Sequence, residues 1–334
     1  MSNRPGEFDL IGKYFRPLAS AESGAADLCD DAAVLAPKDG HHLVVTMDTL
    51  VSGVHFLEFT PPHFIAAKTL RVNLSDLAAM GAEPAWYTLS LSLPSGGENI
   101  YGDDWLDSFT QALEVEQMLY AITLVGGDTV STPGPLSLSV TAMGWVKTGQ
   151  EMKRSGAKPG DIIYTSGTIG DATLGLAAVQ GDFSELEPSS LEILTERYHR
   201  PQPRLDLGRE LYGLASAAID ISDGLVQDMG HICTCSKVTA TIRADDIPLS
   251  AVGQGIVEND PDMMNVIMSG GDDYELVFCV PPERQNAVTN LADKLNLSLT
   301  PIGVVEADGA GNQVKIIDGD GVEIRMPTTG YRHF

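Results

Sequence analysis

L-V-V-T-M-D-T-L-V-S-G-V-H-F, residues Leu43 to Phe56, is an apolar, β-branched run that leads to a single carboxylate, Asp48, and then to a glycine and His55. β-Branched residues favour strands, whereas glycine and polar residues mark the turn that follows a strand. The stretch therefore predicts a buried strand that ends near Asp48 and presents a carboxylate there.

The same form, an apolar run followed by aspartate, occurs at three other places: I-T-L-V-G-G-D (122–128), A-A-I-D-I-S-D (217–223) and V-I-M-S-G-G-D-D (266–273). A single aspartate in such a place is more often a helix cap or a turn residue than a ligand. Caps have no reason to follow apolar strands so regularly, however. The set therefore predicts four strand-like runs that deliver carboxylates to a site.

Composition narrows the class of protein. The 334 residues carry 46 acidic and 21 basic side chains, a net charge of −25, which argues against nucleic acid or an anionic membrane surface as a partner. No apolar run approaches the roughly 20 residues of a membrane span. Met1–Gly12 is polar and lacks the apolar core of a signal peptide, and the four cysteines lack zinc spacing. We therefore expect a cytoplasmic location.

Residues 1–150 predict a first domain with a mixed or antiparallel sheet, because its strand-like segments alternate polar and apolar residues. Its polar face could be solvated or could pair with a second subunit. The expected helices are 7–19, a helix opened by Pro61-Pro62 and stopped near Gly81, and 105–120. The expected strands are 30–35, 43–48, 85–93, 122–125 and 136–146.

Residues 151–334 predict a second, α/β domain, which begins where the chain becomes polar and glycine-rich around 147–159. The expected strands are 161–164, 239–242 and 276–280. The expected helices begin at Ala172 and Leu225 or span 205–215 and 283–295, with a polar linker over 182–190. The fold class is thus α/β, with α and β elements mixed, in two domains.

Convergent carboxylates repel one another unless cations lie between them. Oxygen ligands without a cluster of His or Cys favour a hard ion, Mg²⁺ or Mn²⁺, over zinc, and Mg²⁺ usually bridges a few carboxylates to substrate phosphates. Backbone N–H groups of the glycine turns at 126–128, 166–168, 222–224 and 269–271 can face phosphate oxygens. Walker-A and G-x-G-x-x-G motifs are absent. These residues predict a Mg²⁺-dependent enzyme that handles phosphate between two α/β domains.

The chain resembles the thiamine-monophosphate kinases, within the ATP-binding superfamily that includes aminoimidazole-ribonucleotide synthetase and selenophosphate synthetase. The motifs that carry the resemblance are GEFDLI (6–11), DDAAVL (30–35), DTLVSGVHF (48–56), VNLSDLAAMGA (72–82), GGDT (126–129), RSGAKPGD (154–161), RPQPR (200–204), IDISDGL (219–225), GGDDYEL (270–276) and GYRHF (330–334). Many motifs in the same order make the signal specific.

The resemblance implies a kinase, a transferase of thiamine biosynthesis, that uses ATP and several Mg²⁺ ions, and a homodimer joined through its first domains. Carried over by position, the implied metal ligands are Asp31, Thr46, Met47, Asp48, Asp76, Asp128, Asp220 and Asp223. The implied ATP contacts are Gly127, Asp128, Arg154 and Ser222, and the implied contacts to thiamine monophosphate are His55, Asp272 and Tyr331. No residue is assigned as a general base, since the acceptor is already an anionic phosphate oxygen.

Three positions depart from the family pattern: Cys29, Met47 and Asp272 stand where the family usually has Gly, Thr and Glu. Cys29 changes a close backbone approach, Met47 can offer a cation only its backbone carbonyl, and Asp272 reaches one methylene less far.

Two other classes of function remain as alternatives: a different ATP-dependent synthetase or maturation enzyme of the same superfamily, and a non-catalytic nucleotide-binding protein. A selenophosphate synthetase would need a reactive Cys near its N-terminus, where residues 1–19 have none, and the hydrogenase-maturation relatives end in a Cys, whereas this sequence ends in Arg-His-Phe. A non-catalytic nucleotide-binding protein would not need the full set of aspartates. Tight ATP binding without turnover would favour the non-catalytic binding protein.

Overall fold

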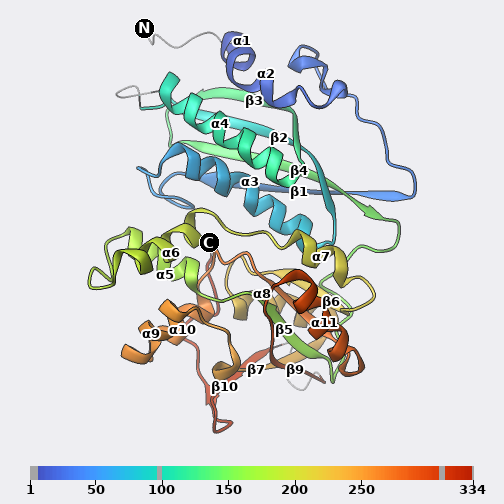
Figure 1. Ribbon diagram of the computed structural model, residues 1–334, viewed down its shortest axis with the longest axis vertical. Helices are drawn as coiled ribbons and strands as arrows, with labels where there is room; N and C mark the ends of the chain where they lie inside the picture. Colours follow the sequence, from blue (N-terminus) through green and yellow to red (C-terminus); the bar gives the residue numbers. More distant parts are fainter. Residues whose placement is uncertain (1–6, 96–99, 308–312, 333–334) are drawn as a thin grey trace. The chain divides into compact units, whose positions relative to one another are not determined.

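The computed structural model describes residues 7–95, 100–307 and 313–332, and the chain divides into two compact units (Figure 1). One unit is formed by Met1–Leu77 and Ala82–Gly149, the other by Ala78–Gly81 and Gln150–Phe334. Each contains a mixed sheet with helices, so the predicted fold class is confirmed. Gly6, His333 and Phe334 of the quoted motifs lie outside the described residues.

The first unit is built on a four-stranded sheet in the order β1-β4-β2-β3, in which β2 and β3 are parallel and the other pairs are antiparallel. Its strands are β1 (His41–Val51), β2 (Glu83–Pro94), β3 (Thr123–Thr132) and β4 (Ser137–Lys147). Its helices are α1 (Glu7–Leu10), α2 (Arg16–Ala19), α3 (Pro62–Ala79) and α4 (Asp103–Tyr120), with a π-helical turn at Ile11–Phe15 and a 3₁₀ turn at Ser23–Leu28.

The two faces of this sheet differ. Alternate residues of β2 and β4, such as Leu91 and Val140, are fully buried on the face that α3 and α4 cover (Figure 1). On the opposite face of the edge strand β1, Leu43, Val45 and Met47 are 45, 56 and 61% exposed. The prediction of a buried strand is therefore wrong for this face of β1: these three side chains form an open apolar stripe, whereas Leu50 on the other face is buried.

Asp48 does not end its strand. β1 continues to Val51 and pairs with β4 along its whole length, with Asp48 opposite Val140. Asp128 also lies inside a strand, because Gly126 and Gly127 continue β3 beside β2 instead of forming a turn. Both carboxylates thus lie within strands, where alternation decides which face each side chain takes.

Three further expectations are corrected by the structure. Residues 30–35 form no strand: the Val34 N–H donates to the Gly24 carbonyl oxygen (2.8 Å) in an irregular segment. The run 266–273 is the helix α10 (Met263–Ser269) followed by an irregular segment in which Asp272 has a φ of +70°, since a short apolar run does not distinguish strand from helix. The helix α6 (Pro188–His199) begins inside the predicted linker, with proline in its first turn.

The second unit is built on a seven-stranded sheet in the order β11-β10-β7-β9-β5-β8-β6, antiparallel except for the pair β7–β10. Its strands are β5 (Ile162–Ser166), β6 (Ala217–Asp220), β7 (Val238–Arg243), β8 (Leu276–Val280), β9 (Leu299–Ala307), β10 (Val314–Ile317) and β11 (Glu323–Ile324). Its remaining helices are α5 (Asp171–Val179), α7 (Leu205–Leu211), α8 (Leu225–Ser236), α9 (Ala251–Asn259) and α11 (Gln285–Leu295).

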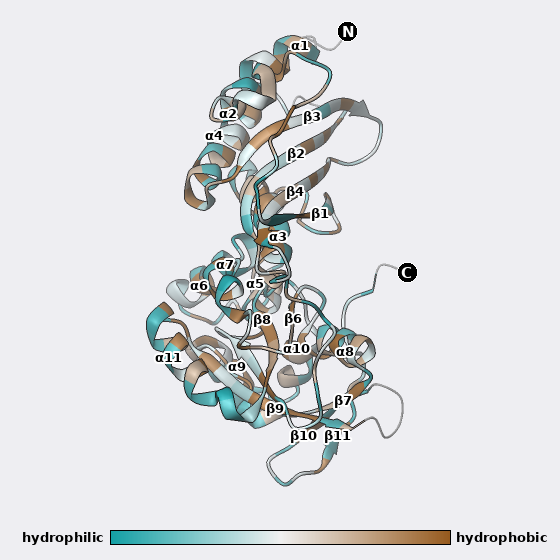
Figure 2. Cartoon of the chain, turned by 90° about the vertical axis from the view of Figure 1, so that its right-hand side faces the viewer, coloured by the Kyte–Doolittle hydropathy of each residue, from teal (hydrophilic) through white to brown (hydrophobic). Residues whose placement is uncertain are grey.

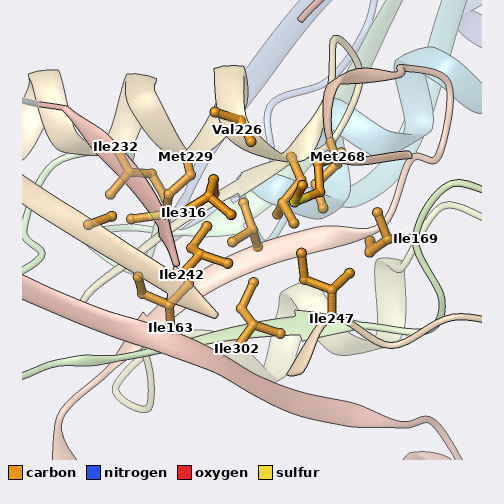
Figure 3. Close-up of a cluster of buried hydrophobic side chains, with 14 of the residues drawn as sticks. Ile163, Ile169, Val226, Met229, Ile232, Ile242, Ile247, Met268, Ile302 and Ile316 are labelled. Atoms are coloured by element: carbon orange, nitrogen blue, oxygen red, sulfur yellow. The ribbon is translucent and has the colours of Figure 1, made fainter. Parts of the chain in front are cut away.

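The core of this unit fixes the helix α8. The five apolar residues of β8 are all buried, and the strand is coloured as hydrophobic in Figure 2. Figure 3 shows Met229 and Ile232 pointing from α8 toward Ile242 and Ile316 of the sheet. All four are at most 2% exposed, so α8 is anchored by its apolar face and the turn before it is held in place. In the part of the chain that the structure describes, no helix is long and apolar enough to span a membrane.

Candidate active site

The first group of candidate residues joins β1 to α3. The Thr46 hydroxyl donates a hydrogen bond to the Asp76 carboxylate, and the backbone N–H of Asp48 donates to Asn73 Oδ1 (3.1 Å). β1 is an edge strand, so no neighbouring strand accepts this N–H; the Asn73 side chain does. The structure thus brings Thr46, Asp48 and Asp76 together.

Asn73 is a site residue to which sequence reasoning assigned no role. It is fully buried and oriented by its own hydrogen bond, from Nδ2 to the Thr69 carbonyl oxygen (3.1 Å). The helical spacing of Thr69, Asn73 and Asp76 is visible in the sequence and predicts one shared face of the helix, but it does not show which of them holds the strand. Met47 is not part of this group, because its side chain lies on the opposite, exposed face of β1.

The second group lines a pocket of about 230 Å³ within the first unit. Three predicted residues, Asp31, Gly127 and Asp128, lie around it. The pocket's apolar lining comes from the N-terminal helical segment, the 3₁₀ turn and strands β2 and β3: Phe8, Ile11, Phe15, Ala25, Leu28, Leu89, Leu91, Leu124 and Val125. The pocket combines an apolar wall with an acidic rim.

The sheet itself explains why residue 127 is glycine. A Cβ at Gly127 would lie 2.0 Å from the Leu89 carbonyl oxygen of β2, so any side chain would force the two parallel strands apart. The close approach is required by strand pairing, whether or not a ligand binds.

His55 belongs to the turn that follows β1. The Val51 N–H donates to His55 Nδ1 (3.1 Å), while the His55 N–H donates to the Val51 carbonyl oxygen (2.9 Å). An accepting Nδ1 places the ring proton on Nε2. The half-buried imidazole is therefore neutral and fixed in one orientation by its own turn.

The third group lies in the second unit, at the end of β6. Asp220 is the last residue of that strand and is buried. The Asp272 N–H donates to the Ser222 carbonyl oxygen (2.9 Å), and the Tyr331 N–H donates to the Asp223 carbonyl oxygen (2.9 Å). Segments far apart in the sequence thus meet at one turn, as the sequence motifs predict for a shared site.

A buried carboxylate organises this turn. The Oδ2 atom of Asp228, in the first turn of α8, accepts hydrogen bonds from the backbone N–H groups of Ser222 (2.9 Å), Asp223 (3.0 Å) and Gly224 (3.1 Å). Burial raises the pKa of Asp228 to about 7, against the opposing effect of these N–H donors. The three amides already have an acceptor, so the expectation that they face phosphate oxygens is wrong for this turn.

Arg154 is not brought into this group. Its carbonyl oxygen accepts a hydrogen bond from Ser236 Oγ (3.1 Å), at the end of α8 opposite the Ser222–Gly224 turn. α8 has 12 residues and is therefore about 18 Å long. Ser222 and Arg154 therefore lie near opposite ends of that helix.

The motif GGDDYEL contributes structural residues besides Asp272. Asp273 accepts from the N–H of Gly170 (2.8 Å) at the start of α5, and burial raises its pKa to about 8. The buried Glu275 carboxylate is bound by Arg197 (2.9 Å) and by Arg204 through Nε (2.6 Å). Sequence reasoning assigned no role to this ion-pair network. Among the described residues, no three His, Cys, Asp or Glu side chains are grouped closely enough to hold a metal ion by themselves.

Two family models match the chain and cover most of both units. The model described as AIR synthase related protein, N-terminal domain, matches residues 29–146, and the corresponding C-terminal domain matches residues 158–315. The fold and the acidic groups therefore define the class of protein: a two-domain AIR synthase related protein.

Relatives narrow this class further. The thiamine-monophosphate kinase of Salmonella typhimurium is 41% identical over 331 residues, 98% of each sequence. The crystal structure of thiamine-monophosphate kinase from Stenotrophomonas maltophilia K279a is 45% identical, with a TM-score of 0.79, over 88% of this chain and 90% of that one. AaThiL complexed with AMPPCP and TMP is 31% identical, with a TM-score of 0.76, over 98% and 97%. The chain belongs to the thiamine-monophosphate kinase family, which confirms the resemblance.

Proposed function

We propose that this chain transfers the γ-phosphoryl group of ATP to thiamine monophosphate, giving thiamine diphosphate and ADP. The observation that carries the proposal is the end-to-end likeness to thiamine-monophosphate kinases, including one complexed with AMPPCP and TMP. The acidic groups of the two units agree with it, since two polyanionic substrates need cations held by carboxylates.

The donors present fit Mg²⁺, a hard cation that prefers oxygen ligands and retains several waters. Thr46, Asp48 and Asp76 offer one oxygen set in the first unit, and Asp31 with Asp128 at the pocket offers another. Asp220 and Asp223 offer a third oxygen set in the second unit. Met47 could contribute only its backbone carbonyl oxygen. We assign the residues of these three sets and Met47 as the metal ligands. Few protein carboxylates at each place leave coordination positions for substrate phosphates and water.

Bound Mg²⁺ would neutralise the phosphates of both substrates and stabilise charge on the group in transfer. The chain's own residues hold and orient the segments that carry the assigned metal ligands. Asn73 fixes the β1 backbone at Asp48, and Asp228 fixes the turn that carries Asp223. The acceptor oxygen is already anionic, so we assign no general base and propose direct in-line transfer.

The pocket of the first unit supports a nucleotide site. Its apolar wall suits a purine base, while Asp31 and Asp128 at its rim suit cation-bound phosphates. Gly127, Arg154 and Ser222 are the other ATP contacts that we assign. For thiamine monophosphate we assign His55, whose Nε2 carries the ring proton, with Asp272 and Tyr331.

We further propose a homodimer formed through the first domain, residues 1–150, and a cytoplasmic location. The exposed stripe of Leu43, Val45 and Met47 supports the dimer, since a contiguous apolar surface is costly in water. The cysteines of the described chain form no disulfide, which suits a reducing compartment. Residues 151–334 form the domain that contributes Asp220, Asp223 and the segment with Tyr331.

Incubation with ATP, Mg²⁺ and thiamine monophosphate, followed by chromatography, tests the proposed function. We expect thiamine diphosphate and ADP in equal amounts, and no product with unphosphorylated thiamine as the matched control acceptor. A folded protein that binds AMPPCP but yields no thiamine diphosphate would refute the proposal and would favour a non-catalytic nucleotide-binding protein.

A further inference from the structure

One side-chain amide links the turn at Asp223 to the C-terminal segment. Gln227 Nε2 donates to Asp223 Oδ2 (3.1 Å) and also to the Tyr331 carbonyl oxygen (2.9 Å). An amide nitrogen carries two hydrogens, so it can make both bonds at once. Gln227 follows Asp223 by four residues, on the first turn of α8, so its side chain reaches back over the turn.

The backbone strengthens this link. The Tyr331 N–H donates to the Asp223 carbonyl oxygen (2.9 Å), so Tyr331 is held at both its N–H and its C=O. A Cβ at Gly330 would lie 2.5 Å from the Gln227 Cβ and 2.8 Å from the Asp223 carbonyl oxygen. Only glycine allows the segment to approach so closely. Tyr331 as a whole remains 47% exposed while its backbone is fixed.

Asp223 and Gln227 together therefore bind the segment Gly330–Tyr331 and fix its position. We propose that Gln227 is a positioning residue that sets acceptor recognition: it orients the Asp223 carboxylate and holds Tyr331 where its ring meets thiamine monophosphate. The proposal rests on the proposed function, which gives Asp223 and Tyr331 their roles.

Only an amide at position 227 can donate both hydrogen bonds without adding a charge beside Asp223. Leucine at 227 would keep the volume but donate no hydrogen bond to either oxygen. Glutamate would keep the length but place a second carboxylate beside Asp223, and like charges repel. Gln227 is half-buried on a helix whose core face lies elsewhere, so both substitutions should leave the fold intact.

The test compares Gln227→Leu and Gln227→Glu with Gln254→Leu, whose amide makes a similar bond to Glu258 (3.0 Å) on the exposed face of α9. One measurement is hydrogen exchange of the Tyr331 amide in the metal-free protein. The other is calorimetric binding of thiamine monophosphate and, separately, of AMPPCP.

In both Gln227 variants we expect Tyr331 exchange to accelerate at least ~10-fold and the Kd for thiamine monophosphate to rise about tenfold. Without Mg²⁺ the Kd for AMPPCP should change less than about twofold, because Asp223 would meet the nucleotide only through a cation, and Gln254→Leu should match the unaltered protein. Unchanged exchange, or unchanged affinity for thiamine monophosphate, would overturn the proposal. Neither readout needs turnover, so a failure of the kinase assay would refute the proposed function separately.

Discussion

The Oδ2 atom of Asp228 lies 3.0 Å from the backbone nitrogen of Asp223, in a turn whose next N–H, on Gly224, points at the same oxygen. The donors of the turn are thereby directed inward, toward a carboxylate of the protein. What the turn offers outward is the Asp223 side chain, which Gln227 orients. Such a turn suits a cation, in contrast to glycine-rich loops that bind phosphate through their amides.

Replacing Asp228 should cost stability. Asp228→Ala leaves three backbone N–H groups without an acceptor in a partly buried turn, and we expect the free energy of unfolding to fall by about 2–4 kcal/mol. Asp228→Asn retains one acceptor oxygen and should cost less. Urea unfolding measures both, with Asp182→Ala on an exposed loop as the control. Equal stability of Asp228→Ala and the unaltered protein would mean that the turn does not depend on this carboxylate.

Removing the charge of Asp48 should impair turnover. We expect Asp48→Asn to lower kcat at least ~100-fold, roughly 2.7 kcal/mol of barrier, because a cation ligand is lost while the side-chain volume is kept. Thiamine diphosphate formation in saturating Mg²⁺ measures the effect. The matched control is Asp39→Asn, an exposed aspartate in the turn before β1. Near-normal turnover of Asp48→Asn would remove Asp48 from the assigned ligands.

Much of the fold could be predicted because its signals are local. Pro62 starts α3 and Gly81, at a φ of +70°, follows its end, and alternation along β2 was visible in the sequence. The exposure of β1 could not be predicted, since an apolar alternate face looks the same whether it packs inside one chain or stays open. Local pattern also could not distinguish the helix α10 from a strand.

The site, like the fold, could be predicted only in part. Asp220, Asp223 and Asp272 were found from motifs, but the contacts that hold them come from residues with no motif of their own. Asp228 and Gln227 act through hydrogen bonds to a turn of the backbone, and such partners depend on how the chain folds back. The position of Arg154 at the far end of α8 is likewise a property of tertiary structure.

The stability of the protein should depend on pH through Asp273. Burial raises its folded-state pKa to about 8, whereas an unfolded aspartate titrates near ~3.9. Between these values the folded state keeps a proton that the unfolded state releases. This contribution is therefore full below pH ~4 and declines, by up to ~1.4 kcal/mol per pH unit, until about pH 8. Unfolding of Asp273→Asn across this range should lack that slope. Parallel profiles for the two proteins would show that Asp273 is ionised in the fold.

The open face of β1 should control association. Val45 is 56% exposed between Leu43 and Met47, so Val45→Glu would place a charge in the centre of the proposed dimer contact, where desolvating it is costly. Sedimentation velocity should show a dimer for the unaltered protein and a monomer for Val45→Glu at the same micromolar concentration. Met118→Glu is the matched control, because Met118 is 71% exposed on α4, away from this strand face. A Val45→Glu protein that remains dimeric would place the subunit contact elsewhere, whereas a monomeric unaltered protein would exclude the dimer itself.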